Sequence, residues 1–211
     1  MSAKKAFLGI VLASLALLSP GANASYIHYS YGYSNSVPSG NFVSDWNGLG
    51  SVTSSTLSAF NNVVAPYAGS YTFSFLDISF AVSGGHAGQT MTFQLAPDAG
   101  YGAALYLDGN LLTSSTSDIW WGYDWNSGSG ILSNKIGLTE GTHTLSAYWA
   151  EGCCNGGQSA RYTVDGGQSF QTLSVTNLDS LSVPEPASLA LLGLGLAGIG
   201  VVRRRQKGRT S

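Results

Sequence analysis

Apolar side chains alternate with polar ones in several short runs between residues 71 and 175, and glycine, asparagine, aspartate or serine bounds most of these runs. A period of two places every second side chain on one face of a β-strand, whereas an amphipathic helix needs a period near 3.6. The candidate strands are 71–82, 91–95, 103–107, 145–149, 160–164 and 170–175. Short strands at this spacing predict an all-β protein, an antiparallel β-sandwich of jelly-roll or similar Greek-key type.

Turn sequences, and the strand face on which the apolar residues fall, refine this pattern. Asp108-Gly109 is a two-residue hairpin signal between the candidate strand 103–107 and the residues that follow. Asp165-Gly166-Gly167 makes a similar turn between the last two candidate strands. Within 71–82 the apolar residues change parity, which predicts a β-bulge or strand break near Phe75-Leu76.

The segment from Ser25 to Gly69 is polar, aromatic and only weakly patterned. We expect it to supply one or two edge strands together with loops. Leu57 to Val64 has apolar spacing that suits one or two helical turns.

The N-terminus has the layout of a secretory signal peptide, residues 1–24. Lys4 and Lys5 precede an apolar stretch from Ala6 to Leu18, and the small-residue triplet Ala22-Asn23-Ala24 follows. We expect export through the Sec translocon and cleavage by signal peptidase after Ala24. An N-terminal anchor is the alternative, but 13 apolar residues are few for a membrane span.

The C-terminal segment 183–211 reads as three blocks. Val183-Pro184-Glu185-Pro186 opposes helix formation, and an apolar run without charges follows from Ala187 to Val202. A helix of these residues would span roughly 24 Å, slightly less than a typical hydrocarbon core. The arginines Arg203, Arg204 and Arg205 favour the cytoplasmic side, which leaves the upstream chain outside.

These blocks together resemble a PEP-CTERM sorting signal, the C-terminal tag of many exported proteins in exopolysaccharide-producing Gram-negative bacteria. The resemblance rests on Val183, Pro184, Glu185, Pro186, the glycine-rich apolar run and Arg203, Arg204 and Arg205. It implies recognition by an exosortase and removal of the tail near the motif. It also implies transient anchoring in the inner membrane through 187–202, followed by release to the outer surface or the extracellular matrix. A plain single-span anchor is the alternative.

Between the two signals lie a candidate domain, 25–177, and a poorly patterned linker, 178–182. Residues 25–183 contain ten acidic side chains but only Lys135 and Arg161 as basic ones, a formal net charge of −8. Such a surface is repelled by phosphate backbones and anionic lipids, which argues against nucleic-acid binding.

The stretch from Gly102 to Gly167 is similar to PA14-like and fibro-slime-like β-sandwich modules. The similarity rests on three segments, namely Gly102 to Gly109, Leu138 to Leu145 and Tyr148 to Gly157. It implies an extracellular sandwich with glycan contact. The adjacent aspartates that hold calcium in the sugar-binding members have no Asp-Asp counterpart in this sequence, so a calcium site is not carried over.

A cluster rich in aromatic and acidic residues follows residue 117. Its candidate glycan-binding residues are Asp118, Trp120, Trp121, Asp124, Trp125 and Asn126. Aromatic rings stack on the apolar faces of sugars, while carboxylates and amides bond to hydroxyls. The alternative is that the tryptophans pack in the core or cover a sheet edge. Asp124-x-Asn126-x-Gly128 offers oxygen ligands for calcium but lacks the spacing of a recognised loop, and we expect no resident cofactor or metal.

Cys153 and Cys154 are the only cysteines, and export places them in an oxidising compartment. Four outcomes are open: a vicinal disulfide, intermolecular bonds, free thiols, or a soft metal shared with a partner. The flanking glycines supply the backbone freedom that a vicinal bridge needs.

No catalytic constellation emerges, and we expect a protein that is not an enzyme. His143 is expected to be a strand-entry residue that faces solvent or bonds to backbone. Glu140 and Glu151 are the one carboxylate pair considered for glycoside chemistry. The sequence thus favours an exported binding module for exopolysaccharide. The alternative is a structural or adhesive matrix protein that acts through protein contacts or cysteine cross-links.

Overall fold

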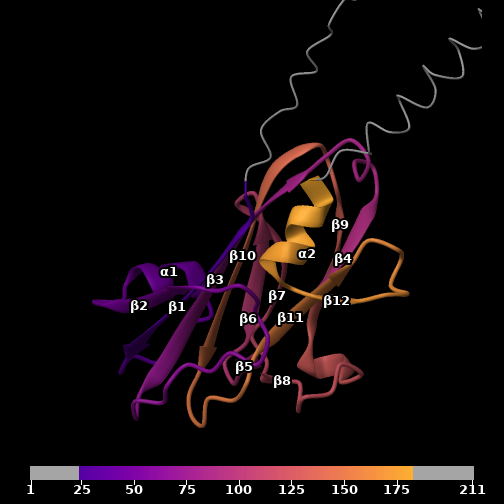
Figure 1. The fold of residues 1–211 in the computed structure, drawn as a ribbon. Coiled ribbons are helices and arrows are strands. Elements are labelled where there is room, and N and C mark those ends of the chain that lie inside the picture. Colours follow the sequence, from indigo (N-terminus) through magenta and orange to yellow (C-terminus); the bar gives the residue numbers. More distant parts are fainter. Residues whose placement is uncertain (1–23, 183–211) are drawn as a thin grey trace, which may run out of the picture.

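The computed structural model describes residues 24–182, which form two antiparallel sheets packed face to face (Figure 1). The larger sheet has the order β2 (Val52–Thr56), β1 (Tyr26–Ser34), β3 (Tyr71–Val82), β10 (Gly141–Glu151), β6 (Ala103–Leu107) and β7 (Asn110–Ser115). The smaller sheet has the order β12 (Gln171–Thr172), β11 (Ser159–Thr163), β4 (Thr90–Ala96) and β9 (Leu132–Gly137). Strands β5 (Asp98–Ala99) and β8 (Ile119–Trp120) form a separate pair. The all-β sandwich expected from the alternation is therefore present.

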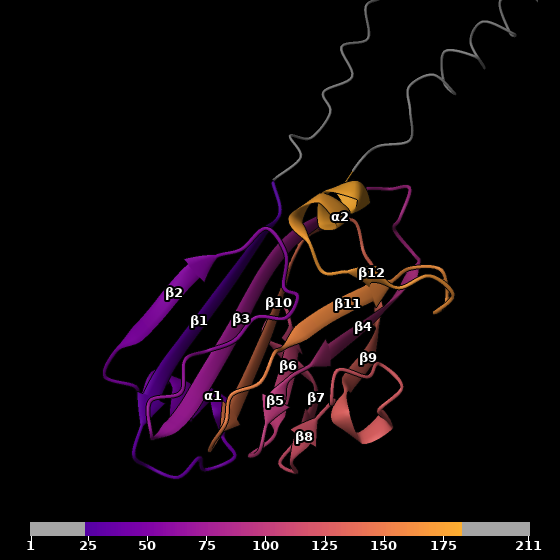
Figure 2. The same cartoon turned by 60° about the horizontal axis from the view of Figure 1, so that its bottom comes forward.

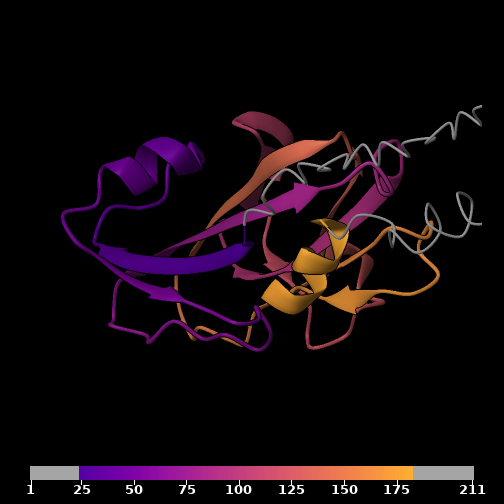
Figure 3. The same cartoon turned by 45° about the horizontal axis from the view of Figure 1, so that its top comes forward.

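The short helices lie outside the sheets. They are α1 (Phe42–Asn47), α2 (Val175–Asp179) and two 3-10 turns, η1 (Gly128–Gly130) and η2 (Ser180–Ser182). Figure 3 looks onto the end of the sandwich where α2 lies near β12. Asn177 ties the two elements by donating a hydrogen bond from Nδ2 to the carbonyl of Thr172. Within residues 24–182 no helix is long and apolar enough to cross a membrane.

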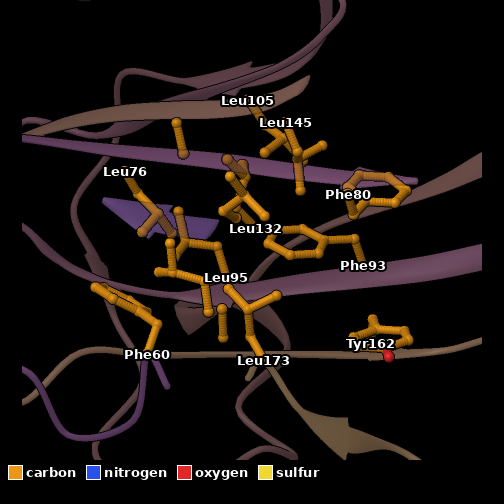
Figure 4. Packing of buried hydrophobic residues seen from close by; sticks show 14 of the residues in the cluster. Phe60, Leu76, Phe80, Phe93, Leu95, Leu105, Leu132, Leu145, Tyr162 and Leu173 are labelled. Atoms are coloured by element: carbon orange, nitrogen blue, oxygen red, sulfur yellow. The ribbon is translucent and has the colours of Figure 1, made fainter. Parts of the chain in front are cut away.

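The core fills the space between the two sheets. In Figure 4, Phe80 and Leu145 of the larger sheet face Phe93 and Leu95 of the smaller one. All four side chains are at most 1% exposed. Burying a side chain of this size contributes about 1.5–3 kcal/mol, so the alternating positions drive the sandwich together.

Strand β3 runs without the predicted bulge. Its pairing with β1 and with β10 keeps one register along the whole strand. The early aromatic residues lie on the outer face instead, where the ring of Phe75 is 5.4 Å from that of Trp46 in α1. The parity change therefore reflects a strand with apolar residues on both faces. The register shift that does occur lies in the β6–β7 hairpin, between Leu105 and Tyr106.

The N-terminal segment is more regular than expected. β1 is an interior strand of nine residues, β2 is the edge strand, and α1 begins after Asn41, whose side chain accepts from the Ser44 N–H. The prediction of helical turns at Leu57 to Val64 is wrong, because this segment is irregular and carries isolated bridges from Ala59 to Ser174 and from Val63 to Gln158. The N–H of Phe60 donates to the carbonyl of Leu173, so tertiary pairing outweighs the local spacing.

Residues 178–182, expected to be a linker, belong to the folded domain. Leu178 and Leu181 are each 2% exposed and lie in the core cluster. The carbonyl of Leu181 accepts from the N–H of Ser83, just beyond the end of β3. The described chain therefore ends beside the C-terminal end of β3.

Several sequence expectations fall outside the described residues. They are the signal peptide up to Asn23, the motif 183–186, the apolar run 187–202 and the basic residues from Arg203 onward.

Candidate ligand-binding site

The end of the sandwich opposite α2 carries three converging segments, namely the turn at β5, the loop around β8 and the loop that follows β10 (Figure 2). Together they enclose an open pocket of about 570 Å³. Its lining residues are Asp98, Gly100, Asp118, Trp120, Tyr123, Glu151, Cys153, Cys154, Asn155 and Gly156.

The pairing of β5 with β8 sets which side chains reach this pocket. Asp98 lies opposite Trp120, and Ala99 lies opposite Ile119. Ala99 and Ile119 are 0% and 3% exposed and belong to the core. Because successive side chains of a strand point to opposite faces, Asp98 and Trp120 are directed outward. The ring of Trp120 is 41% exposed.

Glu151, the last residue of β10, organises the loop after the strand. Its carboxylate accepts hydrogen bonds from the N–H groups of Gly100 and Gly152, both at 2.6 Å, and of Cys153 at 2.9 Å. Three donors on one nearly buried carboxylate fix the position of the loop relative to β5. Glu151 is thus a structural anchor of the pocket as well as part of its wall.

Asp98 and Gly156 close the pocket on the other side. The N–H of Gly156 donates to Oδ2 of Asp98. A Cβ atom at Gly156 would lie 2.7 Å from the Trp120 ring, which is closer than real contacts allow. Only glycine lets the backbone pass directly against this ring.

The pocket is acidic. Burial raises the pKa of Asp98 to about 6, and the neighbouring carboxyls of Glu151 and Asp118 add to the rise, although the Gly156 N–H opposes it. Of the residues that line the pocket in the described chain, none is basic. Burial and the neighbouring carboxyls thus make ionisation of Asp98 costly.

Two of the six candidate glycan-binding residues line the pocket, and the other four lie outside it. Asp118 and Trp120 line the pocket. Trp121 is 6% exposed, and its Nε1 donates to the carbonyl of Gly157 at 2.8 Å. Trp125 packs 4.9 Å from the Trp121 ring and lies under the Arg161 guanidinium at 4.2 Å. The two latter tryptophans therefore support the loop, as the packing alternative expects.

Asp124 and Asn126 form a local turn outside the pocket. Oδ1 of Asp124 accepts from the backbone N–H of Asn126 at 2.8 Å and from its Nδ2 at 3.0 Å. These two bonds hold Asp124 and Asn126 against each other. Among residues 24–182 no group of three or more histidine, cysteine, aspartate or glutamate side chains is arranged to hold a metal ion.

Several pocket residues carried no usable sequence signal. Asp98 is a single acid in a turn, and it enters the site only through the long-range pairing of β5 with β8. Asn155 donates from Nδ2 to the carbonyl of Ala65 at 3.0 Å and to Oγ1 of Thr72 at 3.1 Å. Its Oδ1 is buried and has no hydrogen-bond partner among the described residues.

A second hollow of about 660 Å³ adjoins the first. The two share Gly100, Glu151 and Cys153, so the loop after β10 lies between them. Tyr71 and Tyr101 stand on its other side with their rings edge to face at 5.3 Å.

Other residues considered from the sequence are placed elsewhere. Glu140 precedes β10 and Glu151 is its last residue, so the two lie roughly 35 Å apart, whereas a glycosidase pair needs about 5–9.5 Å. That pairing is excluded. His143 is 8% exposed and bonds through Nε2 to the Thr139 carbonyl at 3.0 Å, which confirms backbone bonding. Its Nδ1 lies 2.9 Å from Oδ2 of Asp108, a partner that sequence reasoning missed.

Comparison with known proteins covers the tail and the fold separately. Residues 182–205 match the family described as PEP-CTERM protein-sorting motif. No curated protein matches the sequence.

Solved structures resemble the sandwich. The PA14 domain of the MpAFP antifreeze protein has a TM-score of 0.52 and 12% identity, with 72% of this chain and 88% of that domain covered. The PA14 sugar-binding domain from an RTX adhesin has a TM-score of 0.49 and 9% identity, covering 73% of this chain and 97% of that one. The Epithelial Adhesin 9 A domain from Candida glabrata, in complex with Galb1-4GlcNAc, has a TM-score of 0.49 and 8% identity, covering 71% and 90%. The chain therefore joins a β-sandwich similar in fold to PA14 domains to a PEP-CTERM sorting motif, which marks it as an exported protein.

Proposed function

We propose that this protein is a non-enzymatic binding module that holds a saccharide in the pocket formed by β5, β8 and the loop after β10. The observation that carries the proposal is the Trp120 ring, 41% exposed and flanked by the carboxyls of Asp98 and Asp118. An aromatic face packs on the C–H face of a sugar, and carboxylates accept hydrogen bonds from its hydroxyls.

The charge of the domain narrows the class of saccharide. Ten acidic residues against two basic ones, and a pocket wall that contains Asp98, Asp118 and Glu151, oppose an acidic polymer. The ligand is a neutral or amine-bearing saccharide, supplied by an exopolysaccharide at the outer surface or in the extracellular matrix.

The position of the pocket suits this location. The described chain ends beside Ser83, next to one end of β3. The pocket lies near the other end of that strand, roughly 36 Å away, because its lining residue Glu151 pairs with Thr72. A domain still joined to a membrane through its C-terminal tail would thus present the pocket away from the attachment point. An exosortase is the partner proposed to act on the tail.

The test compares two tryptophan variants of the processed protein. Binding to neutral cello-, galacto- and chito-oligosaccharides and to a uronate oligosaccharide would be measured by calorimetry. Trp120→Ala removes the stacking face and should weaken binding roughly tenfold, which corresponds to about 1.4 kcal/mol. Trp46→Ala, which removes a ring on the outer face of the larger sheet, should bind like the wild type.

Equal losses in both variants would remove the assignment of the pocket, and tight binding of the uronate alone would remove the proposed ligand class. A structural role is the second candidate, because Cys153 and Cys154 are exposed and unbridged in the structure. Covalent oligomers that disappear on reduction, without affinity for any saccharide, would favour it.

A further inference from the structure

Cys153 and Cys154 lie side by side on the rim of the pocket. Both thiols are exposed, and both residues line the pocket. Cys154 has a φ of 60°, a left-handed conformation that is uncommon for a residue other than glycine. This turn bends the backbone at the pair, and the two thiols lie close enough for Cys154 to influence the pKa of Cys153, although adjacent side chains of an extended chain point apart.

The surroundings of the pair disfavour the thiolate form. The hydrogen bond to Cys154 is the main cause that raises the pKa of Cys153 to about 11, and the carboxyls of Glu151 and Asp98 add to it. Because the thiolate is the reactive form, this raised pKa slows the first exchange step at neutral pH, and the step should become faster as the pH rises.

The loop that carries the pair also holds the pocket together. Just after Cys154, the N–H of Gly156 donates to Asp98, and the N–H of Gly157 donates to the Tyr123 hydroxyl at 3.1 Å. The carbonyl of Gly157 accepts from Trp121 Nε1. Any change in the backbone at Cys153 and Cys154 is therefore passed directly to the residues around Trp120.

We propose that Cys153 and Cys154 close to a vicinal disulfide after export and that this bond fixes the shape of the saccharide pocket. The effect on ligand affinity rests on the proposed function, whereas the formation of the bond does not. One cysteine thiolate attacks an external disulfide, forms a mixed disulfide and releases the first external thiol. The neighbouring thiolate then attacks the mixed disulfide and releases the second external thiol. The Sγ–Sγ bond forms, the external disulfide is reduced to two thiols, and the cysteines give up two protons and two electrons.

The same chemistry argues against cross-links between chains. A disulfide from Cys153 to another molecule always has the Cys154 thiol beside it, at a far higher effective concentration than any second chain. Exchange therefore returns the bond to the vicinal pair. In the described chain, no cluster with a third ligand supports a metal-bound alternative.

The bond is tested without any ligand on the exported protein. Intact mass and alkylation under denaturing conditions should show a loss of two hydrogens and no modified cysteine. After reduction, both cysteines should become alkylated. Reduction should also change the tryptophan fluorescence of the wild type but not that of Cys153→Ser/Cys154→Ser. Two free thiols, or a disulfide-linked dimer, would overturn the proposal.

The effect on the pocket is tested by calorimetry with the neutral oligosaccharide that binds the oxidised protein. Reduction should weaken binding about threefold to tenfold, because a pre-organised loop loses less entropy on binding. The double serine variant should bind like the reduced protein in both conditions. Equal affinity before and after reduction would overturn the link between the bond and the pocket, and absence of saccharide binding would count against the proposed function alone.

Discussion

His143 and Glu151 lie on the same strand, β10, with exposed fractions of only 8% and 9%, but their surroundings differ in charge. His143 faces Asp108, a carboxylate that balances it when it is protonated. Glu151 faces Asp98 in a pocket that also contains Asp118. The first pair joins a hairpin to the strand, whereas the second concentrates like charges beside an exposed aromatic ring. Such unfavourable clustering is typical of binding sites and seldom serves stability.

The two ends should therefore contribute to stability with opposite signs and over different pH ranges, because the His143–Asp108 pair stabilises the fold whereas ionised Asp98 costs stability. Burial alone would lower the pKa of His143, but its hydrogen bonds to Asp108 and Thr139 raise it above the ordinary value. The pKa of Asp108 is lowered, because the Thr144 N–H and His143 outweigh its burial. At the other end the pKa of Asp98 is raised to about 6.

The largest effect is expected from Glu151→Ala. Three backbone N–H groups lose their acceptor, and the free energy of unfolding should fall by about 2–3 kcal/mol in chemical denaturation. The relief of repulsion with Asp98 offsets only part of this loss. Asp118→Ala is the matched control, since its exposed side chain should change stability by less than about 0.5 kcal/mol. A loss no greater than that of the control would show that Glu151 does not anchor the loop.

A smaller, pH-dependent effect is expected from His143→Ala. A histidine whose pKa is raised on folding stabilises fully below its unfolded pKa, and this contribution disappears as the pH rises through the folded value. The variant should lose about 1 kcal/mol more at pH 5.5 than at pH 9, a modest figure because Asp108 is 44% exposed. Denaturation at both pH values measures this difference. A loss that grows with pH would contradict the pairing with Asp108.

The smallest effect, with the opposite sign, is expected from Asp98→Asn. A carboxyl whose pKa is raised on folding costs stability above its unfolded pKa. Asp98 must release its proton in a partly buried position and beside other carboxyls. The variant should gain about 1 kcal/mol at pH 7, after allowance for screening, and nothing at pH 4. The amide oxygen still accepts from Gly156. Thermal unfolding at both pH values checks the prediction. A loss of stability at pH 7 would contradict the conclusion that ionised Asp98 destabilises the fold.

The fold could be predicted from the sequence better than the pocket, for a physical reason. Alternation and turn chemistry are local, and the Asp108-Gly109 hairpin forms as expected, with left-handed φ values of 49° and 77°. Which of Trp120 and Trp121 lines the pocket is not determined by the local sequence. The pairing of β8 with β5 decides which neighbour faces the pocket, and no pattern within two residues shows that parity. Cluster composition therefore identified the region but did not separate Trp120, which lines the pocket, from Trp121, which is buried.

Segments whose pairing leaves no alternating pattern could not be predicted from the sequence, for the same reason. Val63 forms an isolated bridge with Gln158, far away in sequence, so residues 57–64 resembled a helix until their partner was known. The segment 178–182 was mistaken for a linker in the same way. Its two buried side chains, Leu178 and Leu181, are too few to show a period.

The proposed saccharide binding is tested most directly by following the indole N–H resonances of the five tryptophans of the processed protein by NMR. The titration would use neutral cello- and galacto-oligosaccharides. We expect the Trp120 resonance to move most and to saturate, a smaller shift at Trp121 through the loop, and none at Trp46 on the outer face. A saturating shift at Trp46 with Trp120 unmoved, or no shift at any tryptophan, would contradict the assignment of this pocket.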